Sequence, residues 1–268
     1  MILSGKPVAE KIYESLKVEV KTLRQKGIKP ALAVVLVGDD PASLMYVKKK
    51  EEKANELGID FQLFHFSQIT LEEEMVKIIK KINSNPGMHG LIVQLPLPEK
   101  FNVNKILAEI SPTKDVDHLN NGEYLPPTAM SVIELLDYYK INLLDKKIVL
   151  VGYGKLVGKP LEEILQAKGL KPVVCDSRTI DLASKTMDAD VIISGVGVPN
   201  LIKPEMVKSS VIIVDAGTAE ASGKTVGDVD SSVYEKVTAY SPVPGGVGPI
   251  TVAGLMKNLV EAAKKQNL

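Results

Sequence analysis

The sequence is poor in cysteine and histidine, and it contains no tryptophan. Its one cysteine, Cys175, cannot form an intrachain disulfide, which is typical of a protein from a reducing compartment. The three histidines, His65, His89 and His118, have no metal-ligand spacing with this cysteine or with one another. We therefore expect no disulfide and no metal site.

Net charge and long apolar runs are missing as well. Lys+Arg and Asp+Glu both number 33, so no overall field attracts nucleic acid or anionic lipid. The longest apolar runs, such as residues 31–37, are too short to cross a bilayer, and the first residues lack the apolar core of a signal peptide. We expect a cytoplasmic protein that binds neither nucleic acid nor a membrane.

The sequence does contain a regular alternation of strand-like and helix-like segments, which predicts an α/β fold with parallel sheets. In the first half the expected elements are helices at 7–25, 43–57 and 71–83 and strands at 30–37, 59–66 and 90–95. In the second half they are strands at 147–151, 171–175, 190–194, 211–214 and 236–240 and helices at 158–168, 180–187 and 251–266. The polar stretch 120–127 indicates a domain boundary, and Thr128 is a candidate N-cap for a linking helix.

Residues 242–251, PVPGGVGPIT, hold three prolines and three glycines in ten positions. Proline lacks an amide donor and glycine adopts conformations closed to other residues, so we expect neither a helix interior nor a central strand here. Since an ordinary turn needs about two to five residues, the stretch favours a rigid backbone against which a ligand ring can lie.

A candidate dinucleotide-binding turn follows the strand at 147–151. Gly152 and Gly154 match the first two glycines of a Rossmann turn, whereas Gly158 lies one position later than the third. The expected strand before the turn and the expected helix after it support the assignment. The loops 195–197 and 215–218 also follow strands, at the edge of the sheet where ligands bind in open α/β folds.

Asp176, at the end of the next strand, has three open interpretations. It suits a hydrogen bond from a ribose hydroxyl, as in NAD enzymes. Ser177 and Arg178 follow at once and suit a 2′-phosphate instead. Asp176 is equally explained as a turn or cap residue.

The chemistry-bearing candidates lie in the first half. Tyr46 and Lys50 are four residues apart and share a helix face, but Lys50 belongs to the charged run 48–53, which is typical of a solvated surface. Gln94 ends a buried strand and needs hydrogen-bond partners, and Asp117 is either a site residue or a turn former. From the residues alone, a site and an ordinary surface stay equally open.

Taken together, these segments resemble the bifunctional methylenetetrahydrofolate dehydrogenase/cyclohydrolase family over nearly the whole chain. The stretches that carry the resemblance are SGK at 4–6, PAS at 41–43, YVKKK at 46–50, GLIVQLPLP at 90–98, KDVD at 114–117, VGKP at 157–160, GDVD at 227–230 and PVPGGVGPIT at 242–251.

The resemblance implies a folate-binding catalytic domain at 1–122, joined by the C-terminal helix 251–268, and a Rossmann-type NAD(P)-binding domain at 123–250. It implies a folate cleft between them and a homodimer. The implied activity oxidises 5,10-methylenetetrahydrofolate to the methenyl form with NADP and hydrolyses that product to 10-formyltetrahydrofolate, in one-carbon metabolism and purine biosynthesis.

The resemblance also assigns residues. The implied catalytic group is Lys50 as the catalytic lysine, Gln94 as its hydrogen-bond partner, Tyr46 at the border of the folate ring and Asp117 on the pterin. Further folate contacts are implied for Leu95, Pro244, Gly245 and Gly246. The implied cofactor contacts are Gly152, Tyr153, Gly154, Ser177, Arg178 and Thr218.

The chain departs from the family mostly on the cofactor side. Tyr153-Gly154 replaces a common Arg-Ser pair, Asp176 replaces a common histidine and Thr218 a common isoleucine; away from that side, Pro127 stands where cysteine is common. Asp176 favours NAD and Arg178 favours NADP, so we expect NADP by family habit and keep NAD open. The remaining alternatives are a chain with only one of the two activities, another Rossmann oxidoreductase of the shikimate-dehydrogenase type, or a non-catalytic folate- or nucleotide-binding regulator.

Overall fold

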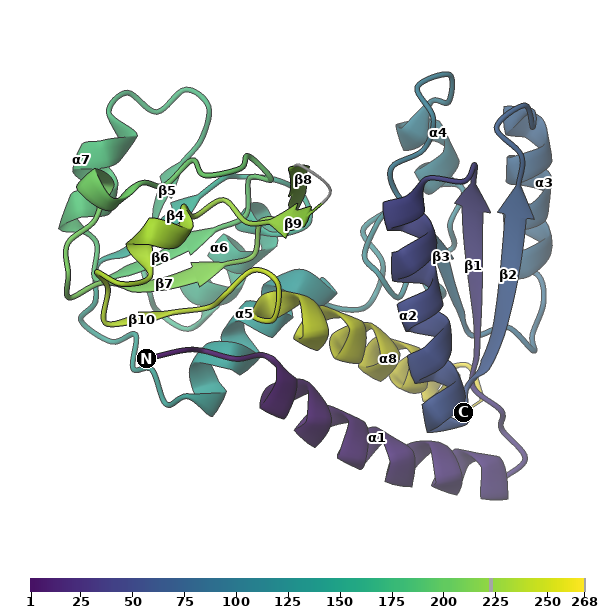
Figure 1. Ribbon diagram of the computed structural model, residues 1–268. Coiled ribbons are helices and arrows are strands. Elements are labelled where there is room, and N and C mark those ends of the chain that lie inside the picture. The colour runs from purple at the N-terminus through teal and green to yellow at the C-terminus, as the bar shows by residue number, and fades with distance from the viewer. Residues whose placement is uncertain (222–223, 268) are drawn as a thin grey trace. The chain divides into compact units, whose positions relative to one another are not determined.

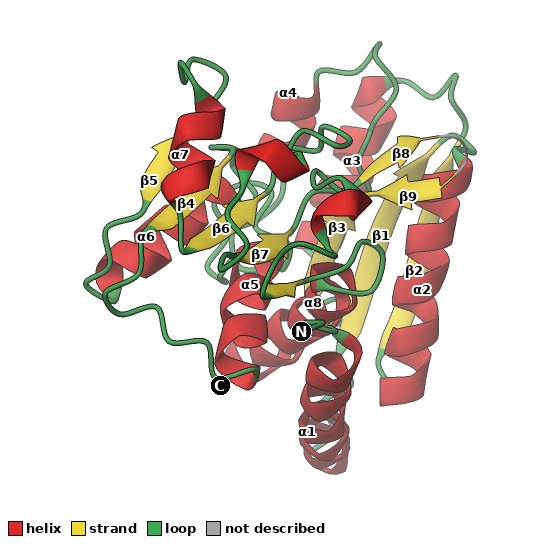
Figure 2. Ribbon diagram, turned by 60° about the vertical axis from the view of Figure 1, so that its left-hand side comes forward, coloured by secondary structure: helices red, strands yellow, loops and turns green. Residues whose placement is uncertain are grey.

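The computed structural model describes residues 1–221 and 224–267 (Figure 1). The chain divides into two compact units, which we name after their sheets. The three-stranded unit holds Lys11–Leu125 and Leu255–Leu268, and the five-stranded unit holds Met1–Glu10 and Pro126–Gly254. Each of these sheets is parallel and is accompanied by helices (Figure 2), which confirms the predicted α/β fold with parallel sheets.

The three-stranded unit is built on the sheet β2-β1-β3. The central strand β1 (Ala31–Val37) is buried along its whole length, as its unbroken apolar run predicts. The parallel neighbours β2 (Asp60–Phe66) and β3 (Gly90–Val93) lie on either side of it. The helices that follow these strands are α2 (Pro41–Leu57), α3 (Glu72–Asn83) and α4 (Val103–Ala108).

Helix α2 has well-defined ends. The Asp40 side chain accepts a 2.8 Å hydrogen bond from the Ser43 amide at its start, and Pro41 occupies the first turn. Gly58 ends the helix in the left-handed conformation, with φ of 75°. These two signals fix where the helix begins and ends.

The five-stranded unit has the strand order β10-β7-β6-β4-β5. Its strands are β4 (Ile148–Val151), β5 (Val173–Cys175), β6 (Val191–Ser194), β7 (Ile212–Asp215) and β10 (Ala239–Tyr240). Its helices are α5 (Pro127–Tyr138), α6 (Gly158–Ala167), α7 (Leu182–Asp188) and the 3-10 helices η1 (Pro204–Met206) and η2 (Ser231–Val233). Strands β8 (Ala219–Ala221) and β9 (Lys224–Val226) form a separate antiparallel pair.

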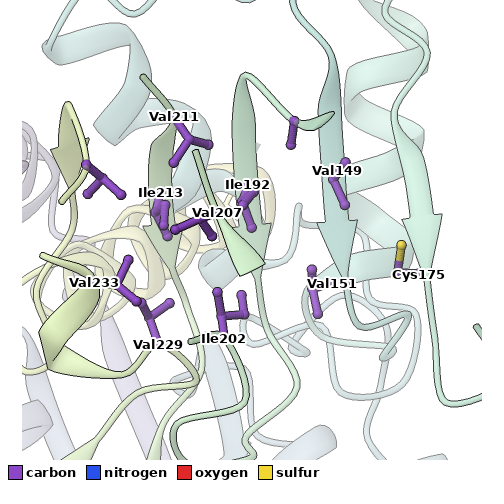
Figure 3. Close-up of a cluster of buried hydrophobic side chains, with 12 residues drawn as sticks. Val149, Val151, Cys175, Ile192, Ile202, Val207, Val211, Ile213, Val229 and Val233 are labelled. Atoms are coloured by element: carbon purple, nitrogen blue, oxygen red, sulfur yellow. The ribbon is translucent and has the colours of Figure 1, made fainter. Parts of the chain in front are cut away.

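The core of this unit covers one face of its sheet (Figure 3). Val149 and Val151 are two residues apart on β4 and therefore point to the same face. Ile192 and Ile213 continue the layer on β6 and β7, and connecting segments close over it with further buried valines, Val207, Val211, Val229 and Val233. A sheet packed in this way holds the carboxyl ends of its strands in a fixed order.

Helices α1 (Lys6–Gln25) and α8 (Val247–Lys265) each have residues in both units. In the second half of α8, Asn258 Nδ2 donates hydrogen bonds of 2.9 Å to the carbonyls of Val116 and Leu125. Lys264 Nζ lies 2.6 Å from Glu19. These contacts attach the end of α8 to the three-stranded unit.

Residues 1–10, which the sequence analysis assigns to the first domain, group with the five-stranded unit. The Leu3 amide donates to the Tyr240 carbonyl and the Gly5 amide to the Gly245 carbonyl, both at 2.8 Å. The limits of the two folding domains stay a prediction.

Three local expectations are wrong. Helix α8 begins at Val247 rather than at 251, because Pro249 lies in its first turn, where no backbone donor is needed. Pro126 is the N-cap residue of α5, and Thr128 lies inside the helix. The strand expected at 236–240 forms only at its last two residues, as β10. Its first residue, Lys236, instead belongs to a turn, in which its amide donates to the Val233 carbonyl.

Candidate active site

Lys50 and Gln94 meet in the three-stranded unit. Lys50 lies on α2, and Gln94 directly follows β3. The lysine Nζ donates a 2.8 Å hydrogen bond to Gln94 Oε1. Gln94 Nε2 donates to the Leu95 carbonyl at 2.7 Å, which orients the amide so that its oxygen faces the lysine. The amine is therefore held by a neutral partner.

Lys50 differs from the other lysines of its charged run. Lys48 is an exposed partner of Glu52, at 4.0 Å, and Lys49 is exposed, with its Nζ 5.6 Å from the centre of the Tyr46 ring. Lys50 is partly buried. It lies three residues after the buried Val47, so the helix turns it toward the protein.

Burial changes the ionisation of this group. Loss of water lowers the pKa of Lys50, and the nearby charge of Asp117 opposes that effect without reversing it. The same loss of water raises the pKa of Asp117, against the opposing charge of Lys50. Each side chain is thus shifted toward its neutral form.

The loop that carries Asp117 is held by a buried aspartate. Asp115 is fully buried, and its carboxylate accepts backbone hydrogen bonds from Leu119, Asn120 and Gly122 at 2.8, 2.6 and 3.1 Å. Asp115 stands in the family stretch KDVD at 114–117, and this role was not predicted from the sequence. Its position two residues before Asp117 was the available signal.

The other residues expected at this site fall into two groups. Tyr46 lies one helical turn before Lys50, and Leu95 follows Gln94; both are partly buried. The structure thus brings together Tyr46, Lys50, Gln94, Leu95 and Asp117 in one unit. The turn at 244–246 belongs to the five-stranded unit.

That turn has a rigid main chain. The Gly246 amide donates to the Pro242 carbonyl at 2.7 Å, and Gly245 has φ of 109°, a value that favours glycine. Gly5 packs so closely that an added Cβ would lie 1.8 Å from the Gly246 oxygen. The predicted shaped backbone is present, although its last residues are helical.

The glycines after β4 form a tight strand-to-helix turn. Gly152 has φ of 100°, and an added Cβ on Gly158 would lie 2.0 Å from the Gly152 oxygen. Gly158 therefore provides the close packing of helix on strand, one position later than in the usual pattern. Gly154 faces open space.

A hollow of about 550 Å³ opens beside this turn. Its lining residues are Tyr153, Glu162, Val174, Asp176, Arg178 and Thr179. Arg178 Nη2 lies 2.6 Å from Asp176 Oδ2, and this hydrogen bond holds the pKa of Asp176 below its usual range. The Arg178 side chain is 88% exposed. The Asp176 carboxylate also accepts the Arg178 amide at 2.9 Å, so the turn interpretation of Asp176 is realised as well.

Two family models match the two halves of the chain. Residues 3–117 match the catalytic domain of tetrahydrofolate dehydrogenase/cyclohydrolase, and residues 126–267 match its NAD(P)-binding domain. The chain belongs to the tetrahydrofolate dehydrogenase/cyclohydrolase family. The resemblance found in the sequence is therefore confirmed.

Individual relatives of this family are similar over nearly their full length. The "Bifunctional protein FolD" of Nautilia profundicola is 45% identical, with 98% of this chain and 97% of the relative covered. The crystal structure of the FolD methylenetetrahydrofolate dehydrogenase/cyclohydrolase from Campylobacter jejuni is 40% identical, with a TM-score of 0.91 and 99% of each chain covered. The Trypanosoma brucei FolD, solved with NADP and an inhibitor, is 30% identical, with a TM-score of 0.91 and coverage of 99% and 97%.

As a tetrahydrofolate dehydrogenase/cyclohydrolase family member, the chain has a strand-end edge that fits an NAD(P) group. The turn at Gly152 admits no larger residue at Gly158, and the adjoining hollow has a cation, Arg178, at its wall. Ser177 and Thr218 are exposed at the ends of β5 and β7. The match to both family domains decides against a shikimate-type enzyme.

Sequence reasoning missed two buried aspartates of this edge, Asp215 and Asp228. Both belong to stretches that it quotes, one as a strand-end loop and one as a family stretch. For Asp215 the available signal was its position at the end of the buried strand β7, where it must find hydrogen-bond donors.

Within 1–221 and 224–267, no three His, Cys, Asp or Glu side chains gather in a group that could hold a metal ion. Across those same ranges, no helix has both the length and the apolar character needed to cross a membrane.

Proposed function

We propose that this chain oxidises 5,10-methylenetetrahydrofolate to 5,10-methenyltetrahydrofolate with NADP and hydrolyses the product to 10-formyltetrahydrofolate. The observation that carries the proposal is the hydrogen bond between Lys50 and Gln94, next to Asp117, in the unit that matches the family's catalytic domain. The solved relatives from Campylobacter jejuni and Trypanosoma brucei are both dehydrogenase/cyclohydrolases, which supports two activities.

The oxidation removes a hydride from the one-carbon bridge of the folate. A bound nicotinamide supplies the acceptor for this hydride. What the protein contributes is alignment of the reacting atoms. We assign Tyr46 and Leu95 to the folate ring and Asp117 to the pterin, whose amide and amino groups suit a carboxyl partner. The turn at 244–246 is assigned a further folate contact.

The hydrolysis adds water to the methenyl carbon and breaks its bond to one ring nitrogen. A base must take a proton from the attacking water, and the leaving nitrogen must then receive one. The amine of Lys50 suits both steps because burial lowers its pKa toward the working pH. Gln94 holds the amine in place without adding a charge that would keep it protonated.

The dinucleotide is assigned to the carboxyl edge of the five-stranded sheet. We place its phosphates at the turn of Gly152 and Gly154 and its adenosine ribose at the hollow beside Tyr153 and Asp176. Arg178 and Ser177 are the residues assigned to the 2′-phosphate of NADP, since an arginine fork binds phosphate oxygens in pairs. Thr218 is assigned to the nicotinamide half.

The test is to mix the purified protein with methylenetetrahydrofolate and either NADP or NAD, and to follow absorbance of the reduced nicotinamide. We expect reduction of NADP, and a slower rate of reduction with NAD at the same concentration. The second activity is followed separately as loss of methenyltetrahydrofolate absorbance without any dinucleotide. A folded protein that reduces neither cofactor would contradict the dehydrogenase, and one that leaves the methenyl compound intact would contradict the cyclohydrolase.

We also propose a cytoplasmic homodimer that supplies formyl groups for purine synthesis. The edge strand β2 supports a second copy as its partner, because Leu63 is exposed there and one side of the strand is unpaired within the sheet. Sedimentation equilibrium of the purified chain tests the dimer.

A further inference from the structure

Asp228 accepts hydrogen bonds from the last residue of β6 and from the loop that follows it. Its side chain is fully buried. One oxygen, Oδ2, accepts hydrogen bonds from Ser194 Oγ at 2.6 Å and the Val196 amide at 2.7 Å. The other, Oδ1, accepts the amides of Gly197 and Val198 at 2.8 and 2.9 Å. Both carboxylate oxygens therefore accept amides of the loop 196–198, and one of them also binds the end of β6.

A second aspartate ties the neighbouring loop into the same cluster. Asp215, the last residue of β7, accepts the amides of Gly217 and Val229, each at 2.9 Å. An added Cβ on Gly217 would lie 2.2 Å from the Asp228 carboxyl group. The loops after β6 and β7 and the segment around Asp228 thus pack directly on one another.

The loop held by Asp228 lies at the edge of the sheet where a ligand binds in this class of fold. The Gly195 amide donates to the Val151 carbonyl at 2.9 Å, so the loop starts beside the end of β4 and its glycine turn. The loop exposes two apolar side chains, Val196 and Val198, at 41% and 45%. The buried carboxylate of Asp228 holds the loop in one conformation, and the exposed valine side chains give it an apolar surface. Such a surface suits contact with a ligand.

We propose that Asp228 is a positioning residue for dinucleotide binding, which acts by fixing the 195–198 loop in the conformation that the dinucleotide meets. This inference rests on the proposed function. A carboxylate is required, since each of its oxygens faces two donors; an asparagine would turn an N–H donor toward donors at one of them.

The first test is Asp228→Asn. We expect the KM for NADP to rise about tenfold or more, with kcat within about twofold, because the bound state can still reach the same geometry. Hydrolysis of methenyltetrahydrofolate, which needs no dinucleotide, is expected to stay unchanged. Hydrogen exchange at the amides of 196–198 is expected to become faster in the free protein.

The matched control is Asp230→Asn. Asp230 lies two positions further on and accepts hydrogen bonds from the amide and hydroxyl of Ser232, away from the 195–198 loop. In the Asp230→Asn variant, the KM for NADP and the hydrogen exchange at the amides of 196–198 are expected to equal those of the wild type. A second variant, Ser194→Ala, removes one donor to Asp228 Oδ2 and is expected to raise the KM for NADP about threefold to tenfold.

The outcomes separate this inference from the proposed function. A normal KM for NADP in Asp228→Asn, or faster exchange without any change in KM, would overturn the positioning role while leaving the dehydrogenase intact. If Asp228→Asn fails to fold, Ser194→Ala decides by the same two readouts. If the wild type neither binds nor reduces NADP, the proposed function fails first, and this positioning role is rejected with it.

Discussion

Two cationic side chains, one in each unit, have opposite surroundings. In the three-stranded unit, Lys50 is partly buried, is held by a neutral glutamine and has a lowered pKa. In the five-stranded unit, Arg178 is exposed and paired with Asp176, and the pairing raises the pKa of the arginine and lowers that of the aspartate. The first arrangement brings a group toward losing its proton, and the second keeps both charges in place.

This contrast matches the two tasks assigned to the units. Ring opening needs a proton acceptor that becomes a donor, so burial of an amine is useful there. Recognition of a phosphate needs a permanent positive charge in reach of solvent, which an exposed arginine provides. Removal of the Lys50 amine from water thus serves the assigned chemistry, and exposure of the Arg178 guanidinium serves the assigned phosphate binding.

The largest expected effect comes from Lys50→Met. Without the amine, hydrolysis of methenyltetrahydrofolate should fall by roughly 10²- to 10⁴-fold, while thermal unfolding should show a fold at least as stable, because a buried amine is replaced by an apolar chain. The control is Lys49→Met on the same helix, which should hydrolyse at the wild-type rate. Near-normal hydrolysis by Lys50→Met would contradict the assignment of Lys50 as the proton acceptor.

Gln94→Glu should have the next largest effect. A carboxylate beside Lys50 favours the protonated amine and raises its pKa. Since the neutral amine is the base, hydrolysis rises with pH through the pKa of Lys50, and a higher pKa moves this rise to higher pH. The rate at neutral pH should drop about tenfold for each unit of pKa shift, whereas at high pH it should recover. A pH–rate profile that does not move would show that Gln94 does not set the ionisation of the lysine.

Arg178→Ala should change only the cofactor preference. Loss of a charged contact to the 2′-phosphate should raise the KM for NADP by about tenfold. The KM for NAD, which has no such phosphate, should stay within about twofold. The hydrolysis rate without dinucleotide serves as the internal control. An equal change for NADP and NAD would remove Arg178 from the 2′-phosphate site.

The smallest effect is expected for Asp117→Asn on the pH profile of hydrolysis. The charge of Asp117 raises the pKa of Lys50 against the larger effect of burial. Removing this charge should move the pH–rate profile to lower pH. The shift should be opposite in direction to that of Gln94→Glu and smaller. The rates are compared at saturating folate. A shift to higher pH would contradict the arrangement.

The sequence predicts most of the strands and helices because unbroken apolar runs such as 31–37 leave little choice of structure. It predicts less well where proline and glycine dominate. Pro249 marks a break in the sequence pattern, yet it lies in the first turn of α8, where a missing donor costs nothing.

The candidate site shows the same limit more sharply. Lys48 and Lys50 cannot be told apart within the charged run of the sequence. Only the packing of α2 against the sheet makes Lys50 partly buried and leaves Lys48 exposed. The resemblance to a family selected Lys50 in advance; spacing did not. Asp228 was overlooked because its partners, the Ser194 hydroxyl and three backbone amides, lie 30 or more residues away in the chain, and no local pattern encodes such contacts.

The most direct test of the central claim is to titrate Lys50 itself. The Nζ signal is followed by NMR in protein with labelled lysine, with Lys50→Met used to assign it, and hydrolysis is measured over the same pH range. We predict a midpoint below the ordinary lysine value of 10.5 that coincides with the rise of the hydrolysis rate. A midpoint at or above 10.5, or a hydrolysis rate that rises at an unrelated pH, would contradict the account.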